Sequence, residues 1–122
     1  MASAREHLDL AQKHLARVQS AWDPADWPDL ALYGFYCLEN AVVAAATHTR
    51  IATQKSHPAK AAVAQQLAAR HGLPDVSGLL VQLNDARKAE AYGDVTRPEL
   101  DPEDLARRIG QYVRAVEALL GQ

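Results

Sequence analysis

The segment from Leu30 to about Thr49 carries apolar residues on nearly every side of a helix. Such a helix must be covered on several sides, either inside a bundle or partly by a second copy of the chain. Glu39 and Asn40 interrupt it, and polar residues need partners when they are buried. The segment therefore predicts a central helix around which the rest of the chain packs. Its apolar residues are Leu30, Leu32, Tyr33, Phe35, Tyr36, Leu38, Ala41, Val42, Val43, Ala45 and Ala46.

The rest of the chain repeats apolar residues at spacings of three and four, which is the pattern of helices that bury one face. No stretch alternates apolar and polar residues over a useful strand length. A chain of 122 residues suits one hydrophobic core, so the sequence predicts a single all-α domain, an up-and-down antiparallel bundle of four to five helices. The domain spans residues 1–122, and its expected helices cover about 4–22, 26 or 28–49, 57–71, 75–92 and 101–120.

Capping side chains, prolines and glycines mark where these helices begin and end. A serine or aspartate cap accepts from a free backbone N–H at a helix start, and proline loses nothing at the first helical position. A glycine just past a helix permits the left-handed turn that ends it. Four helix starts are marked in this way: by Ser3 with Glu6, by Ser56 or His57 with Pro58, by Asp75 or Ser77, and by Asp101 with Pro102. Gly72 and Gly93 mark two helix ends.

Composition and motifs exclude several classes of protein. The formal net charge of -2 provides no broad basic face for non-specific nucleic-acid binding, so any such contact must be local. The lone cysteine, Cys37, excludes an internal disulfide and a multi-cysteine zinc site, and we interpret it as a buried thiol. We find no glycine-rich phosphate loop, zinc-type histidine pair or serine elbow, and we expect neither a metal nor a cofactor.

The N-terminal residues and the longest apolar run bear on location. Arg5, Glu6, His7 and Asp9 interrupt the beginning of the chain, unlike the apolar stretch of a signal peptide. The longest apolar run, residues 41–46, is far shorter than the roughly 20 residues that cross a bilayer. We therefore expect a cytoplasmic protein without membrane contact.

The segment from Leu83 to Asp94 concentrates hydrogen-bonding side chains where a core helix ends. Arg87 suits a phosphate group because its guanidinium donates two parallel hydrogen bonds, and Lys88 adds charge. Tyr92 offers a ring on which a base stacks. The expected ligand-binding residues are Asn84, Arg87, Lys88, Tyr92 and Asp94.

The same residues also have structural interpretations. Arg87 alternatively forms an ion pair with Asp85, Glu90 or Glu39. The ion pair between Arg87 and Glu39 would lie in the core. Tyr92 alternatively packs at the helix end with its hydroxyl in water.

Three segments resemble the HEPN family of small bacterial and archaeal helical-bundle domains. They are the helix end from Arg87 to Asp94, the aromatic stretch from Tyr33 to Ala41, and Lys55-Ser56-His57. The resemblance covers residues from about 4 to 120. It implies a homodimer whose partners include RNA, a nucleotide or a cognate protein, within a toxin–antitoxin or defence system.

Active members of that family are metal-independent ribonucleases, in which an arginine is followed after four to six residues by a histidine that serves in acid–base catalysis. Arg87 matches the arginine, but no histidine follows it in this chain. Tyr92 or His57 would have to take the place of the histidine, and tyrosine is a poor base at neutral pH because its ordinary pKa is about 10. The catalytic candidates implied are Arg87 and Tyr92, with Glu39 and His57 in support.

Three functions therefore remain open. A HEPN-like binding or regulatory module would recognise its ligand through residues 87–94. A divergent ribonuclease would keep Arg87 for charge in the transition state. A structural protein-interaction homodimer would use the alanine-rich second and third helices as its interface. We expect dimerisation because the segment 30–49 is too apolar to be covered easily by so small a bundle.

Overall fold

The computed structural model describes residues 3–20, 27–92 and 101–121, apart from the side chains of residues 27–28 and 89–92. Every regular element in these ranges is an α-helix, which confirms the all-α prediction. The end predicted near Trp22 for the first helix lies outside the described residues. The helices are α1 (Ala4–Ser20), α2 (Trp27–Thr49), α3 (His57–His71), α4 (Ser77–Tyr92) and α5 (Pro102–Leu120).

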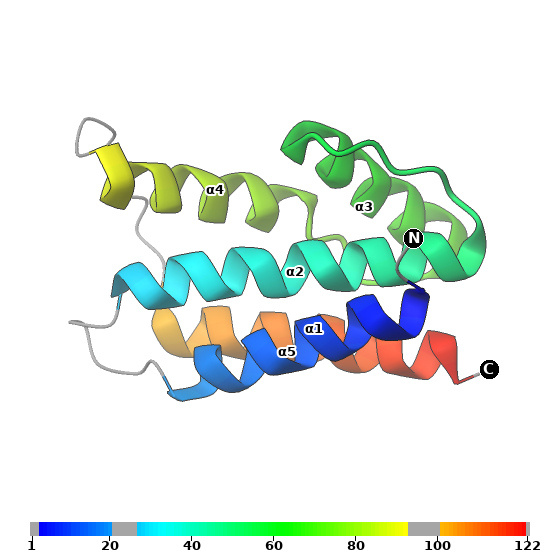
Figure 1. Ribbon diagram of the computed structural model, residues 1–122, viewed down its shortest axis with the longest axis horizontal. Coiled ribbons are helices and arrows are strands. Elements are labelled where there is room, and N and C mark those ends of the chain that lie inside the picture. The colour runs from blue at the N-terminus through cyan, green and yellow to red at the C-terminus, as the bar shows by residue number, and fades with distance from the viewer. Residues whose placement is uncertain (1–2, 21–26, 93–100, 122) are drawn as a thin grey trace.

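Helix α2 lies at the centre of the bundle. Figure 1 shows α3 and α4 on one side of it and α1 and α5 on the other. Helices α1 and α4 run antiparallel to α2, whereas α5 runs in the same direction as α2. Helix α2 packs against each of the other four helices, and α1 is its most extensive neighbour. Helices α1, α2, α4 and α5 thus form the predicted bundle, and α3 is added on one side.

The segment between α2 and α3 brings the chain back along α2. At the end of α2, Arg50 adopts a left-handed backbone with φ 61°, and the amide of Ile51 donates to the carbonyl of Ala46 at 2.8 Å. The chain then returns over α2, so that α3 starts with His57 beside Glu39 of α2 (Figure 1). The first turn of α3 therefore faces the middle of α2 and not its end.

Capping residues fix the helix starts where the sequence marks them. The Ser3 hydroxyl accepts from the Glu6 amide at 3.1 Å, and the Glu6 carboxylate accepts from the Ser3 amide at 3.4 Å, which completes the predicted capping box. The Ser56 hydroxyl accepts from the Ala59 amide at 3.3 Å ahead of α3. Gly72, with φ 69°, ends α3 in the left-handed conformation.

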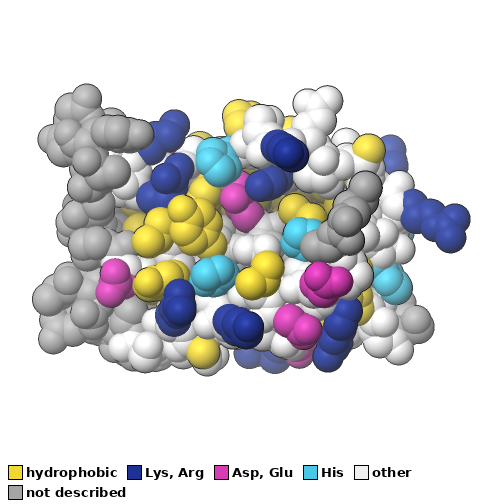
Figure 2. All heavy atoms as spheres, in the orientation of Figure 1, with side chains coloured by type: hydrophobic (Ala, Val, Ile, Leu, Met, Phe, Trp, Pro, Cys, Tyr) yellow, Lys and Arg dark blue, Asp and Glu magenta, His cyan; other side chains and the backbone are white. Residues whose placement is uncertain are grey.

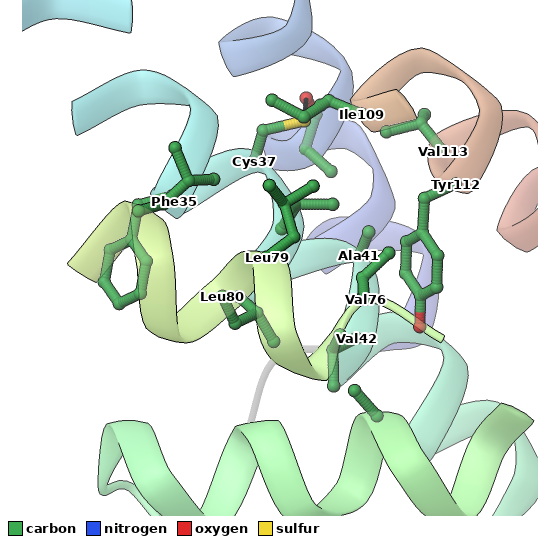
Figure 3. Packing of buried hydrophobic residues seen from close by; sticks show 14 of the residues in the cluster. Phe35, Cys37, Ala41, Val42, Val76, Leu79, Leu80, Ile109, Tyr112 and Val113 are labelled. Carbon is green, nitrogen blue, oxygen red and sulfur yellow. Dashed lines mark hydrogen bonds between the residues drawn. The ribbon is translucent and has the colours of Figure 1, made fainter. Parts of the chain in front are cut away.

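The core fills the space between α2 and its neighbours. Gly34 allows close approach there, because a Cβ at this position would lie 3.0 Å from Cδ1 of Ile109 on α5 and 3.7 Å from Cδ1 of Leu83 on α4. Figure 3 shows Tyr112, Phe35 and Cys37 among the side chains of this core. The largest fully buried side chains are Tyr112, Phe35, Leu8, Leu30, Leu38, Leu67, Leu79, Leu83, Ile109, Val18, Val42 and Val113.

The bundle itself covers α2. Ala41, Ala44 and Ala45 are completely buried within one chain, which confirms that α2 is enclosed on several sides. The apolar character of α2 therefore gives no separate reason to expect a second copy. Among the described residues, one helix segment, Asp29–Thr49, is long and apolar enough to cross a membrane, but 67% of its most apolar window is buried among the other helices. This is the pattern of a core helix.

Candidate functional site

Glu39 is the one charged side chain buried in the described core, where the residue is 6% exposed. Its Oε2 lies 2.6 Å from Nδ1 of His57, and its Oε1 lies 3.4 Å from Nζ of Lys60. His57 and Lys60 are three residues apart in the first turn of α3, so one face of that helix supplies both partners. Each carboxylate oxygen has a partner, which is the condition under which a carboxylate tolerates burial.

This arrangement differs from the core ion pair between Glu39 and Arg87 that the sequence allowed. His57 and Lys60 take both oxygens of Glu39, and Arg87 instead donates to Asn84. The physical reason lies in the return of the chain after α2, which places the start of α3 against the middle of α2. Within the described residues, no ion pair joins Arg87 to Asp85, which is exposed. The side chain of Glu90 lies outside the described residues.

His57 is held by two contacts. Its Nδ1 faces the carboxylate of Glu39, and the edge of its ring packs on Phe35 with centroids 5.0 Å apart and 71° between the planes. A carboxylate only accepts hydrogen bonds, so Nδ1 carries a proton and Nε2 is the ring nitrogen left for a ligand. The side chain is 41% exposed, so a ligand reaches the ring from solvent.

Arg87 contacts the same aromatic ring from α4. Its guanidinium carbon lies 5.2 Å from the centroid of Phe35, and Nη2 donates to Oδ1 of Asn84 at 2.8 Å. A guanidinium only donates hydrogen bonds, so Oδ1 of Asn84 must face it, and the amide NH₂ of Asn84 is left as a donor. The ring of Phe35 thus supports both the histidine of α3 and the arginine of α4.

A pocket of about 140 Å³ opens where α2, α3 and α4 meet. His57 and Asn84 are its polar lining residues. Glu39 backs His57 and Arg87 backs Asn84, so each polar lining residue is held by a charged one. The amide NH₂ of Asn84 is a hydrogen-bond donor on an otherwise apolar surface, and this suits an acceptor oxygen of an anionic group. The apolar part of the lining consists of Phe35, Pro58, Ala61, Leu80 and Val81.

Positive groups predominate at this junction. Figure 2 shows histidine, acidic and basic side chains close together beside an apolar patch on the face that α2, α3 and α4 share. Among the described side chains in contact there, Lys60, Arg87 and the ionisable His57 accompany one carboxylate, that of Glu39. The local field is therefore more positive than the formal net charge of -2 indicates.

The structure brings four of the predicted site residues together around this pocket. Two line it and two stand behind them. They are Glu39, His57, Asn84 and Arg87.

Of the three other predicted site residues, the structure describes the side chain of Lys88 alone. Lys88 is exposed and does not line the pocket. Tyr92 is the last residue of α4, and its side chain lies outside the described residues, as does the whole of Asp94. The roles predicted for Tyr92 and Asp94 stay predictions.

Two residues of the site, Lys60 and Phe35, are absent from the sequence-based list. Both have a spacing signal: Lys60 follows His57 by three positions on α3, and Phe35 precedes Glu39 by four positions on α2. Residues three or four apart share a helix face. Lys60 therefore shares a face of α3 with His57, and Phe35 shares a face of α2 with Glu39; His57 and Glu39 are both predicted supporting residues.

No family model, curated protein or solved structure matches this chain. Within the described residues, no group of three or more histidine, cysteine, aspartate or glutamate side chains is placed to hold a metal ion. The fold and the site thus define a class only, an all-α bundle with a small, mostly apolar pocket at the junction of α2, α3 and α4.

Proposed function

We propose that this chain is a HEPN-like cytoplasmic binding module that recognises a phosphate-bearing ligand, RNA or a nucleotide, at the junction of α2, α3 and α4. The observation that carries the proposal is the hydrogen bond from Arg87 to Asn84 at the edge of the pocket. It leaves the amide NH₂ of Asn84 as a donor in the lining of the pocket and places the positive charge of Arg87 directly behind it. The oxygens of a phosphate accept from several such donors at once.

The surroundings favour a phosphate that is attached to a larger body. Arg87 and Lys88 are adjacent cations in the second half of α4, where Lys88 is exposed, and Lys60 contacts the carboxylate that holds His57. Val81, which lines the pocket, is 53% exposed and offers apolar surface to a base or sugar. A phosphate held by the cations and a base laid against this surface would use both features.

A partner would complete the ligand surface. The pocket of about 140 Å³ is smaller than the usual small-molecule site of about 300–1,000 Å³, so it holds one group of a ligand and not a whole nucleotide. We therefore include in the proposal a homodimer or a cognate partner protein that covers the rest of the ligand. Light scattering with and without RNA measures this assembly, and a strict monomer at high concentration would contradict it.

Fluorescence anisotropy with a labelled unstructured RNA tests the binding role. We expect Arg87→Ala to weaken binding by about tenfold or more, because a hydrogen bond from a charged group to phosphate contributes about 1.5–3 kcal/mol. Asn84→Asp should weaken binding as strongly, since its carboxylate neutralises Arg87 and repels phosphate. Arg70→Ala, an exposed arginine near the other end of α3, is the matched control. Equal affinities of the Arg87 and Arg70 variants would contradict the proposal.

A second function, that of a metal-independent ribonuclease, is favoured by the 2.6 Å contact between His57 and Glu39. A carboxylate that accepts from Nδ1 fixes the tautomer and leaves Nε2 for proton transfer. In this mechanism His57 takes the place of the histidine that does not follow Arg87, and Arg87 stabilises charge on the phosphate.

Cleavage assays separate the two functions. Metal-free tRNA and unstructured RNA are incubated in EDTA with the wild type, Arg87→Ala and His57→Gln, with His71→Gln as the exposed histidine control from the same helix. Glutamine keeps a hydrogen-bonding group but cannot transfer a proton near neutral pH. Cleavage that is lost in both site variants and kept in the control would establish the ribonuclease. Binding that depends on Arg87, without cleavage by the wild type, would leave the recognition module.

A further inference from the structure

A hollow of about 670 Å³ lies beside the end of α2, and none of its lining residues lines the pocket of His57 and Asn84. The start of α1, the last turns of α2 and residues 50–55 surround it. Its volume is within the range of about 300–1,000 Å³ that is usual for small-molecule sites. It is therefore large enough to hold a whole ligand.

The lining of this hollow is both cationic and apolar. Arg50, Lys55 and Lys60 contribute positive charge, and none of the described residues that line the hollow is acidic. Val43 and Ile51 contribute apolar wall. A ligand that satisfies both parts carries an acidic group on an apolar body.

Arg50 is held in an unfavourable backbone conformation at the edge of the hollow. Its φ of 61° makes it the one non-glycine residue with a left-handed backbone in the described part of the chain. Gly72 ends α3 in the same conformation with φ 69°, and glycine has no Cβ to disfavour it. The unfavourable backbone at Arg50 is a reason to test its side chain for a role.

The hollow also contains a polar atom that lacks a partner. The hydroxyl oxygen of Thr53 is buried and has no hydrogen-bond partner among the described residues, and Thr53 belongs to the lining. A buried hydroxyl without a partner destabilises the fold.

We propose that this hollow binds a free organic anion, a carboxylate or phosphate on an apolar body, whose acidic group contacts Arg50 and Lys55. Lys60, with 20% of its side chain exposed, lines the hollow while its Nζ lies 3.4 Å from Oε1 of Glu39. Glu39 also holds His57, so the hollow and the pocket at the α2, α3 and α4 junction meet at one carboxylate. The proposal stands on the residues of the hollow and is independent of the proposed function.

Amide NMR titration of the full chain tests the ligand class. Octanoate and octyl phosphate carry both features, octanamide lacks the charge, and inorganic phosphate lacks the apolar body. We expect the first two to bind at least about tenfold more tightly than the last two, because each charge-assisted hydrogen bond adds more than about 1 kcal/mol. The shifted amides should include those of residues 47–55. Octanoate that binds no better than octanamide, or binding to phosphatidylglycerol vesicles in place of free octanoate, overturns the proposal.

Three variants test the place of binding. Arg50→Gly and Lys55→Gln should each weaken octanoate binding by about tenfold, whereas the exposed control Arg70→Gln should not change it. Arg50→Gly should have a Tm equal to or above that of the wild type, because glycine relieves the left-handed backbone, so a loss of binding is not a loss of fold. Unchanged affinity in both site variants overturns the proposal. A loss of octanoate binding in Asn84→Asp also overturns the proposal, because this variant changes only the pocket of His57 and Asn84.

Discussion

Nδ1 of His57 lies 2.6 Å from Oε2 of Glu39, and the two side chains differ in exposure, 41% for His57 and 8% for Glu39. Lys60 lies 3.4 Å from the second oxygen of the same carboxylate. Burial of Glu39 is therefore offset by two partners that both come from the first turn of α3. The contributions of these three residues to stability must depend on one another.

A double-mutant cycle at His57 and Lys60 should be non-additive. Each single variant, His57→Ala or Lys60→Ala, leaves Glu39 with one partner, and we expect each to lower the free energy of unfolding by about 1 kcal/mol. The double variant leaves a buried carboxylate without a partner, so its loss should reach about 3–5 kcal/mol. Urea unfolding measures all four proteins. As a control, Glu39→Gln in the double variant should recover part of the loss, and strictly additive losses would contradict the shared role of Glu39.

The helices could be predicted from sequence because their signals are local. The capping box of Ser3 and Glu6 and the stop at Gly72 depend on residues within one turn, and the structure has both. Likewise, Asp101 accepts from the amide of Glu103 at the start of α5, as expected from the proline after it. The apolar pattern of α2 likewise predicts its burial, since few positions on it could face water.

The partners within the site could be predicted only in part, because they depend on the return of the chain after α2. The sequence indicates that Glu39 needs a partner, but the choice between Arg87 and His57 is made by where α3 begins in space. That position follows from the backbone of residues 50–56, which begins with the left-handed residue Arg50. A glycine at position 50 would have indicated a left-handed turn, but an arginine does not. The grouping of Asn84 with Arg87, three residues apart on one helix, is local and could be predicted.

Cys37 should be unreactive in the native protein. Its side chain is completely buried, and its Sγ donates to the carbonyl of Ala11 at 3.2 Å. Burial raises the pKa of the Cys37 thiol to about 12, and only the thiolate attacks labelling reagents. At pH 8, we expect a disulfide reagent to label the native chain more than about 100-fold more slowly than the chain unfolded in urea. Equally fast labelling of both forms would show that α1 opens readily from α2.

The stability of α4 should depend on pH through the carboxyl group of Asp75. Its Oδ1 accepts from the hydroxyl of Ser77 at 2.7 Å and from the amide of Ser77 at 2.9 Å, and these hydrogen bonds lower the pKa of Asp75. A lowered carboxyl pKa stabilises the fold above the ordinary value of about 3.9, and this contribution is lost as the pH falls through the native pKa.

The measurement for Asp75 is the difference in Tm between wild type and Asp75→Ala across pH. At pH 7 we expect the variant to melt about 4 °C lower, as for a lost helix-capping side chain. The difference should shrink steadily below about pH 4. Asp85→Ala, an exposed aspartate within α4, should show no such trend. A difference that stays constant down to pH 2 would mean that the charge of Asp75 does not matter.

Tyr112→Phe should stabilise the fold. The ring of Tyr112 is fully buried in the core, but its hydroxyl has no hydrogen-bond partner among the described residues. Burial and the nearby charge of Asp75 raise the pKa of the Tyr112 hydroxyl, so it is neutral near pH 7. Phenylalanine keeps the ring and removes only the unpartnered group, which should raise the free energy of unfolding by about 1 kcal/mol.

The matched control for Tyr112 is Tyr33→Phe, because the half-buried Tyr33 lies at the surface of α2. Its hydroxyl is not among the buried polar atoms without a partner in the described residues, so we expect a change of less than about 0.5 kcal/mol. Urea unfolding of both variants gives the comparison. If Tyr112→Phe instead lowers the free energy of unfolding by about 1 kcal/mol, the hydroxyl has a hydrogen-bond partner in solution. The space between α5 and the start of α4 would then be where that partner, a water molecule or a polar side chain, lies.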